Sequence, residues 1–108
     1  RRGRPERPPV LRVGDLRLDP ARRRVSRGDT EVELSAKEFS LLETLMRRRG
    51  EAVSRFDLLE HGWDSAYEAR SNIVDVYMRR LRAKVDKPFG KRSIETVRGI
   101  GYRIGGEG

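Results

Sequence analysis

Four short alternating segments near the start of the chain constrain its fold more than any other feature. In each of them apolar and polar residues alternate, and they occupy residues 10–13, 16–18, 24–26 and 31–34. The turn-forming pairs Gly14-Asp15, Asp19-Pro20 and Gly28-Asp29 fall between them. Alternation bounded by turn residues is typical of antiparallel strands, so we expect a four-stranded antiparallel sheet. Such a sheet has one apolar face, which the rest of the chain has to cover.

A capped amphipathic helix is predicted next. Ser35 and Glu38 have the spacing of a capping box, in which each side chain accepts a hydrogen bond from the other residue's backbone N–H. The apolar residues that follow at helical spacing are Phe39, Leu42, Leu45 and Met46. Three arginines at 47–49 and Gly50 mark the end of this helix. We interpret the arginines as a solvated helix end that the helix dipole favours, rather than as a DNA contact.

A shorter second helix is expected from the N-cap signal at Ser54 to a stop near Gly62. Its apolar side is predicted to consist of Phe56, Leu58 and Leu59. His61 is the only histidine and has no cluster of carboxylates around it, so we interpret it as a helix-end residue and predict no metal site. A loop follows at 63–70, and Trp63 at its start is expected to fill part of the core.

The third predicted helix, at about 71–85, is the strongest indication of function. The residues that form its narrow apolar stripe are Val74, Met78, Leu81 and Val85. The residues of the opposite face are Asn72, Val76, Arg79, Arg80 and Ala83, with Asp75 and Arg82 beside them. Arginine suits guanine and phosphate, asparagine suits adenine, and a small apolar group suits the thymine methyl. The alternative is an ordinary solvated basic face with an Asp75–Arg79 ion pair at i, i+4.

A β-hairpin is predicted at the end of the chain. Residues 94–97 and 102–104 alternate around the turn Arg98-Gly99-Ile100-Gly101, whose two glycines are expected to permit unusual backbone angles. Arg98 lies at the tip, from which a basic side chain can reach a minor groove or a phosphate. The glycines are not followed by a third glycine or by a helix, so a dinucleotide-binding loop is excluded.

Composition limits the class of protein and of partner. The net charge of +8 attracts polyanions, nucleic acid before anionic membrane. The absence of cysteine excludes disulfides, thiol nucleophiles and cysteine-type zinc fingers. No apolar run is long enough to span a membrane. Because the chain starts with proline-rich basic residues and lacks an initial Met, we expect an interdomain linker remnant at 1–9 and one folded domain at 10–106.

Taken together, the order of these segments resembles the effector domain of the OmpR/PhoB family of bacterial response regulators. The residues that carry the resemblance lie at 34–39, 41–42, 58–59, 63, 74–82 and 96–103. It implies an α+β winged helix-turn-helix with an N-terminal four-stranded sheet, three helices and a C-terminal hairpin wing. It also implies sequence-specific binding of double-stranded DNA by the output domain of a two-component system that controls transcription.

The resemblance implies roles for individual residues. Those at base-reading positions are Asn72, Asp75, Val76 and Arg80. Those at DNA-backbone positions are Tyr77, Arg79, Arg82 and Thr96. Arg98 falls at the wing position that approaches the minor groove. Those in the loop that some members use to contact RNA polymerase are Trp63, Asp64, Tyr67 and Glu68.

The resemblance also implies partners and a location. These are tandem DNA half-sites, self-association on DNA, RNA polymerase, and a sensor kinase that acts only through a receiver domain absent from this chain. No cofactor, metal or catalytic residue is expected, and the location implied is the bacterial cytoplasm.

Two other classes of function agree less well with the sequence. A basic RNA-binding or ribosome-associated module is the alternative, but Trp63, Phe39 and Phe56 are expected to be buried and cannot stack on bases. An enzyme is disfavoured because Asp75, Glu38 and His61 lie on different elements without a convergent nucleophile and base.

Overall fold

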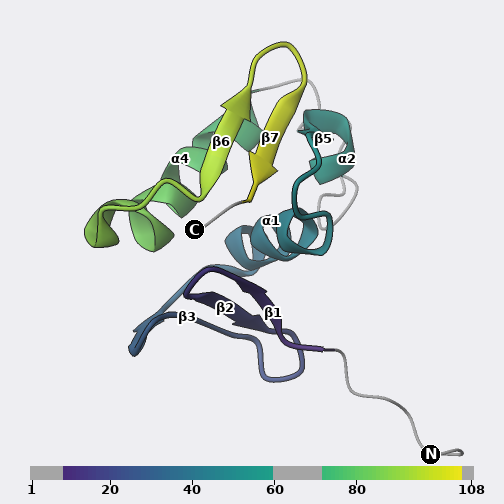
Figure 1. The fold of residues 1–108 in the computed structure, drawn as a ribbon. Coiled ribbons are helices and arrows are strands. Elements are labelled where there is room, and N and C mark those ends of the chain that lie inside the picture. Colours follow the sequence, from purple (N-terminus) through teal and green to yellow (C-terminus); the bar gives the residue numbers. More distant parts are fainter. Residues whose placement is uncertain (1–8, 60–71, 106–108) are drawn as a thin grey trace, which may run out of the picture.

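The computed structural model describes residues 9–59 and 72–105, and within these ranges it has the predicted α+β architecture. Helix α1 lies between the N-terminal four-stranded sheet and the C-terminal hairpin, with α4 beside the hairpin (Figure 1). The predicted linker at 1–9 falls, apart from Pro9, outside the described residues. The same holds for Ser71 and for the predictions at His61, Gly62, Trp63, Asp64, Tyr67 and Glu68.

The N-terminal sheet confirms the strand predictions. Its strands are β1 (Leu11–Val13), β2 (Leu16–Asp19), β3 (Arg24–Arg27) and β4 (Thr30–Val32), antiparallel in the order β1-β2-β3-β4. The last strand ends at Val32, two residues before the predicted end. Alternation holds in the structure, because Leu16 and Leu18 are fully buried while Arg17 between them is exposed. The buried face of this sheet packs on α1.

Helix α1 (Ala36–Arg47) begins with the predicted capping box. The backbone N–H of Glu38 donates to Ser35 Oγ at 3.2 Å, and that of Ser35 donates to Glu38 Oε1 at 2.9 Å. The predicted apolar residues of α1 are buried and contact both the N-terminal sheet and α4. At its end Arg47 pairs with Glu43 at 2.7 Å, and Arg48 pairs with Glu51 and Asp57. These local ion pairs agree with the interpretation of the arginines as a helix end.

The short strand β5 (Val53–Ser54) leads into helix α2 (Arg55–Leu59), and here one prediction is wrong. Leu58 and Leu59 are buried as expected, but Phe56 is 66% exposed. Positions 56 and 58 lie about 200° apart around a helix, so in a helix of five residues they cannot share one face. Within residues 9–59 and 72–105, this one strongly exposed ring is less than the set of stacking aromatics that an RNA-binding platform uses.

Helix α4 (Ile73–Val85), the 3₁₀ turn η1 (Lys87–Phe89) and the hairpin of β6 (Ile94–Val97) and β7 (Gly101–Ile104) complete the described fold. The second sheet has the order β5-β7-β6. Gly99 has φ +77° in the turn, as predicted. For Gly101 the prediction is wrong, because its φ is not positive. It is a glycine for a packing reason: a Cβ there would overlap the carbonyl oxygen of Val53.

A buried arginine joins the two halves of the fold, and the sequence reasoning missed it. Arg27 is 2% exposed at the end of β3. Its guanidinium donates to Val85 O at 2.8 Å, Asp86 Oδ1 at 2.8 Å, Ser93 Oγ at 2.7 Å and Asp15 Oδ1 at 2.7 Å. Side chains two residues apart in a strand point to the same face, so the spacing from Val25 to Arg27 could have predicted that Arg27 shares the buried face. The network fixes the end of α4 and the start of β6 against the N-terminal sheet.

Candidate nucleic-acid interface

Helix α4 separates a buried stripe from a cationic face, as predicted. The four residues of the stripe are 0–2% exposed; they are Val74, Met78, Leu81 and Val85. Asn72 is exposed at the N-cap position, and the helix begins at Ile73 rather than at 71. Arg79 and Arg80 are exposed on the other side, with Val76 half-buried between them and the N-terminus. The structure therefore exposes Asn72, Arg79 and Arg80 away from the buried stripe, whereas Tyr77 packs partly against the core.

The two exposed arginines of α4 have no carboxylate at ion-pair distance in the part of the chain that the structure describes, although the charge of Arg79 acts on Asp75. Neither Arg79 nor Arg80 forms an ion pair with any residue in the described ranges. Arg80 has its guanidinium carbon 5.1 Å from the ring centroid of Tyr77, a cation–π geometry. Such a contact restricts the arginine without removing its hydrogen-bond donors, so Arg80 remains able to make a bidentate contact.

Asp75 is held by two neighbouring elements. Its Oδ1 accepts hydrogen bonds from Arg55 Nε at 2.9 Å and from the Tyr102 hydroxyl at 2.5 Å. The ion pair of Asp75 is thus made with Arg55 of α2, and not with Arg79 as in the alternative interpretation of the helix. Asp75 thereby connects α4 to α2 and to β7. Sequence reasoning gave Arg55 and Tyr102 no such role, because both are distant from Asp75 along the chain.

The pKa of Asp75 follows from these contacts. Burial acts to raise it, but the hydrogen bonds from Tyr102 and Arg55 outweigh burial and hold the pKa below its usual value. Burial and the bond to Asp75 raise the pKa of the Tyr102 hydroxyl. Asp75 is therefore a fixed carboxylate, and Tyr102 a fixed donor, at neutral pH.

We expect Tyr102→Phe to lower the free energy of unfolding by about 1.5 kcal/mol at pH 7, because a partly buried carboxylate loses a donor. Asp75 has a folded pKa below its unfolded value near 3.8, so its contribution exists above that value and is lost as the pH falls through the folded pKa. The difference between the two proteins should shrink below about pH 4. Urea unfolding at several pH values measures it.

The control for that experiment is Glu95→Gln on the same hairpin. Glu95 pairs with Arg103 at 2.8 Å, but both side chains are substantially exposed, so little stability should be lost. A Tyr102→Phe difference that stayed constant down to pH 3 would contradict the assigned role of Asp75.

Arg82 connects α4 to the hairpin. Its guanidinium donates to Ile94 O and to Thr96 Oγ1, each at 3.3 Å, and it lies 5.4 Å from the ring centroid of Tyr102. Two of the residues predicted to contact the DNA backbone, Arg82 and Thr96, are therefore side by side although 14 residues apart in sequence.

Arg98 is exposed in the turn that joins β6 and β7. The backbone N–H of Ile100 closes this turn by donating to Val97 O at 2.9 Å. The hairpin projects beyond the body of the fold, at the top of Figure 1, and carries Arg98 at its end. This position leaves the Arg98 side chain exposed at the end of the hairpin, as predicted.

Other chemistries find little support in the part of the chain that the structure describes. There, no group of three or more His, Cys, Asp or Glu residues could hold a metal ion. Glu38 is bound to the N-cap of α1 and to Lys84 Nζ at 2.7 Å, so it has a structural role. None of the described helices is long and apolar enough to cross a membrane.

Comparison with known sequences identifies the class. The family model "Transcriptional regulatory protein, C terminal" matches residues 29–104. The chain is 62% identical over 108 residues to the transcriptional regulatory protein TcrA of Mycobacterium tuberculosis, covering 100% of this chain and 43% of TcrA. It is 40% identical over 94 residues to CusR of Escherichia coli, covering 87% of this chain and 41% of CusR. It therefore spans less than half the length of these relatives.

Solved structures give the same result. The DNA-binding domain of Klebsiella pneumoniae RstA, solved in complex with the RstA box, superposes with a TM-score of 0.78 at 33% identity, covering 89% of this chain and 96% of that domain. The DNA-binding domain of E. coli CpxR gives a TM-score of 0.77 at 30% identity, covering 94% of this chain and 100% of that domain.

The fold and its cationic helix define a winged helix-turn-helix of the α+β class. The chain belongs to the OmpR/PhoB-type family of transcriptional regulatory protein C-terminal domains. This is a family of transcription regulators and not of enzymes, which agrees with the prediction that the chain is not an enzyme.

Proposed function

We propose that this chain is the output domain of a two-component response regulator and binds double-stranded DNA sequence-specifically to control transcription. The observation that carries the proposal is the exposed cationic face of α4, which continues through Arg82 and Thr96 onto the hairpin. The relative RstA supports it, since its DNA-binding domain was solved on its DNA box.

In this proposal α4 lies in the major groove and the hairpin lies over the adjacent minor groove. The base-reading residues are Asn72, Asp75, Val76 and Arg80; the backbone contacts are Tyr77, Arg79, Arg82 and Thr96; Arg98 enters the minor groove. Asp75 can serve both as a link to Arg55 and Tyr102 and as an acceptor for a cytosine amino group, because a carboxylate accepts several hydrogen bonds.

The proposal extends to the whole regulator. Residues 10–106 form the effector domain, which binds tandem half-sites and self-associates on them. The linker at 1–9 leads to a receiver domain, through which a sensor kinase acts, and the regulator is located in the cytoplasm. The loop with Trp63, Asp64, Tyr67 and Glu68 contacts RNA polymerase. Selection of bound sequences from a random duplex library tests the core of this proposal, and enriched tandem repeats are the expected result.

Arg80 and Arg79 should differ in what they contribute to binding. We expect Arg80→Ala to remove the preference for one base position, at a cost of about 1–3 kcal/mol, because it loses a bidentate base contact. Arg79→Ala should weaken binding to every sequence and lower the slope of log affinity against log salt by about one, because it loses a phosphate contact. Fluorescence anisotropy on specific and nonspecific duplexes over a range of salt concentrations measures both.

The two variants are controls for each other, since each removes one exposed arginine from the same helix. If Arg80→Ala left the ratio of specific to nonspecific affinity unchanged, the base-reading role of Arg80 would be wrong.

A further inference from the structure

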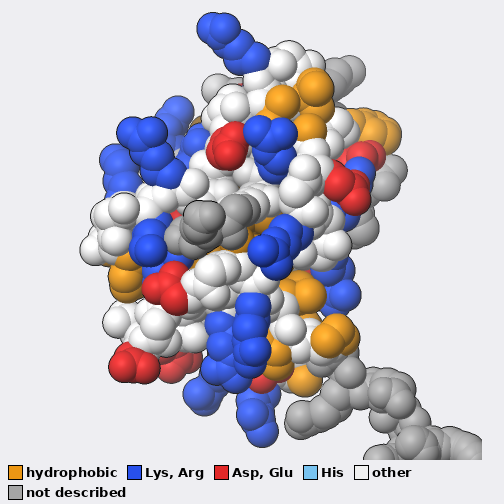
Figure 2. Space-filling model, in the orientation of Figure 1, with side chains coloured by type: hydrophobic (Ala, Val, Ile, Leu, Met, Phe, Trp, Pro, Cys, Tyr) orange, Lys and Arg blue, Asp and Glu red, His pale blue; other side chains and the backbone are white. Residues whose placement is uncertain are grey.

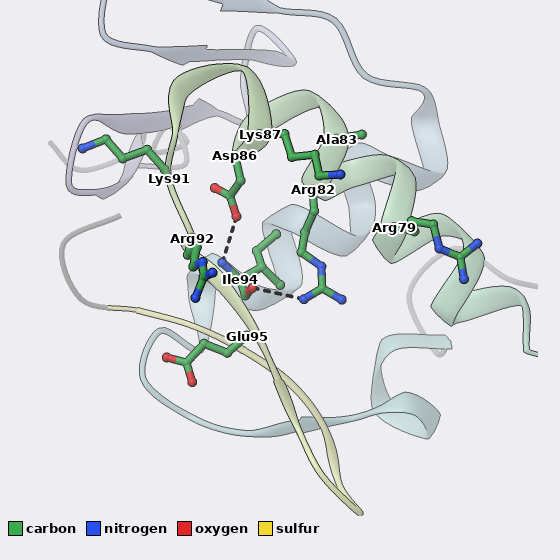
Figure 3. A pocket seen from close by; sticks show the side chains of 9 residues that line it. All are labelled: Arg79, Arg82, Ala83, Asp86, Lys87, Lys91, Arg92, Ile94 and Glu95. Atoms are coloured by element: carbon green, nitrogen blue, oxygen red, sulfur yellow. Dashed lines mark hydrogen bonds between the residues drawn. The ribbon is translucent and has the colours of Figure 1, made fainter.

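An open groove of about 910 Å³ runs between α4 and β6. Figure 3 shows Arg82 crossing it toward the backbone of Ile94, with Arg79 farther along α4. Five cationic side chains from three successive parts of the chain line the groove; they are Arg79, Arg82, Lys87, Lys91 and Arg92. Figure 2 shows lysine and arginine side chains gathered on the α4 side of the molecule, at left, as well as over the N-terminal sheet below.

The acidic residues of the groove are already neutralised. Asp86 is paired with the buried Arg27 at 2.8 Å, and Glu95 is paired with Arg103 at 2.8 Å. In contrast, none of the five cations forms an ion pair within the described ranges, and the hydrogen bonds of Arg82 go to uncharged oxygen atoms. Lys91 and Arg79 interact with Asp15 and Asp75 only through their charge, without a hydrogen bond to either carboxylate. The groove therefore has a strong net positive charge. The dipole of α4 accounts for a cation at Lys87, but not for Lys91 and Arg92, which follow the left-handed turn at Gly90.

We propose that this groove binds the phosphate backbone of the DNA that flanks the site read by α4, with Lys87, Lys91 and Arg92 as additional backbone contacts. This inference rests on the proposed function and extends the length of DNA that the domain contacts. The groove is continuous with the DNA-reading face, because Arg79 belongs to both.

The dimensions and chemistry of the groove fit a nucleic-acid strand. From Arg79 to Val85, the last residue of α4, the helix rises about 9 Å, and phosphates follow one another every ~3.4 Å along the axis for each strand, so more than one fits. Lysine bears a compact charge on a flexible stem, which suits phosphate better than a base edge. Ile94, the large apolar residue of the lining, is only 3% exposed, so it offers a protein partner little apolar surface.

The test is the triple variant Lys87→Gln/Lys91→Gln/Arg92→Gln of the same chain. We expect the slope of log affinity against log salt to fall by about two to three, since each phosphate contact contributes roughly 0.9. The ratio of specific to nonspecific affinity should remain unchanged, because phosphate contacts carry no base information. Wild-type affinity should also fall when base pairs are removed from one flank of the selected site, whereas the triple variant should be insensitive to that removal.

A matched control removes three charges elsewhere. Arg12, Arg17 and Arg22 are exposed on the N-terminal sheet or its turn, and their side chains form no ion pair in the described ranges. The triple change of these residues to Gln should lower the slope by less than one, because it alters net charge without removing a contact. The charge-preserving variant Lys87→Arg/Lys91→Arg/Arg92→Lys should restore the wild-type slope, and thermal unfolding of each variant verifies its fold.

The outcomes separate this inference from the proposed function. Equal slope changes in the groove variant and in the control would overturn the inference, since only net charge would matter. An unchanged slope in the groove variant, with sequence-specific binding intact, would overturn the inference and leave the proposed function standing. If no sequence is enriched from the library, the proposed function fails, and the slope on nonspecific duplex still decides whether the groove holds phosphates.

Discussion

Replacing Arg27 with leucine should destabilise the domain by about 3–5 kcal/mol, the cost of removing one partner from a buried ion pair. The variant leaves Asp86, which is 2% exposed, with a buried charge and no cation. Val85 O and Ser93 Oγ also lose their donor. Because this network fixes the end of α4 and the start of β6, DNA affinity should fall together with stability.

Urea unfolding measures this effect, and Arg24→Leu on the same strand is the matched control. Arg24 is paired with Glu31 at 3.9 Å, but both side chains are more than half exposed, so its loss should cost less than about 1 kcal/mol. Adding Asp86→Asn to Arg27→Leu should recover part of the stability, because a neutral amide costs less to bury than a carboxylate. A loss of stability no larger than that of Arg24→Leu would show that Arg27 has no structural role.

Gly101→Ala is the second change for which a large effect is expected. The added Cβ would overlap Val53 O and lie 3.0 Å from Ser54 Cα, both of them backbone atoms that no side-chain rotation can move. Strand β5 would have to separate from β7, at a cost of about 3 kcal/mol, the upper part of the usual range for overpacking. The hairpin would then lose its support against α2.

The matched control for Gly101→Ala is Gly105→Ala, at the end of the same strand. There the added Cβ would meet only Gly50 Cα at 4.0 Å, an ordinary contact, so the free energy of unfolding should hardly change. Thermal and urea unfolding measure the stability of the two variants. If Gly101→Ala and Gly105→Ala were equally stable, the packing role of Gly101 would be contradicted. Reduced protection of flanking DNA by the Gly101→Ala hairpin would connect the effect to function.

Local patterns in the sequence predicted the elements well, because their signals lie within a few residues. The capping box at Ser35 and Glu38 needs only a spacing of three. The stripe from Val74 to Val85 follows from helical geometry, and the structure buries each of its members. The cationic face on the other side of α4 was therefore also predictable.

Predictions failed where the environment of a residue depends on distant parts of the chain. Phe56 is an exception, because the local geometry of the five-residue helix α2 places it away from the face of Leu58. Gly101 was explained by its own backbone angles, whereas the close approach of Val53 requires it. Asp75 was considered only for bases or for Arg79, while α2 and β7 supply its partners.

The order of strands and helices, the buried and exposed sides of α4 and the family resemblance all follow from short-range periodicity and from residue types at fixed spacing. Family comparison confirmed the resemblance. The buried link at Arg27, the contact of Arg82 with Thr96, and the groove that Lys87, Lys91 and Arg92 share with Arg79 are visible only in the folded chain. Charge compensation and steric fit depend on distances in space, which no local pattern specifies.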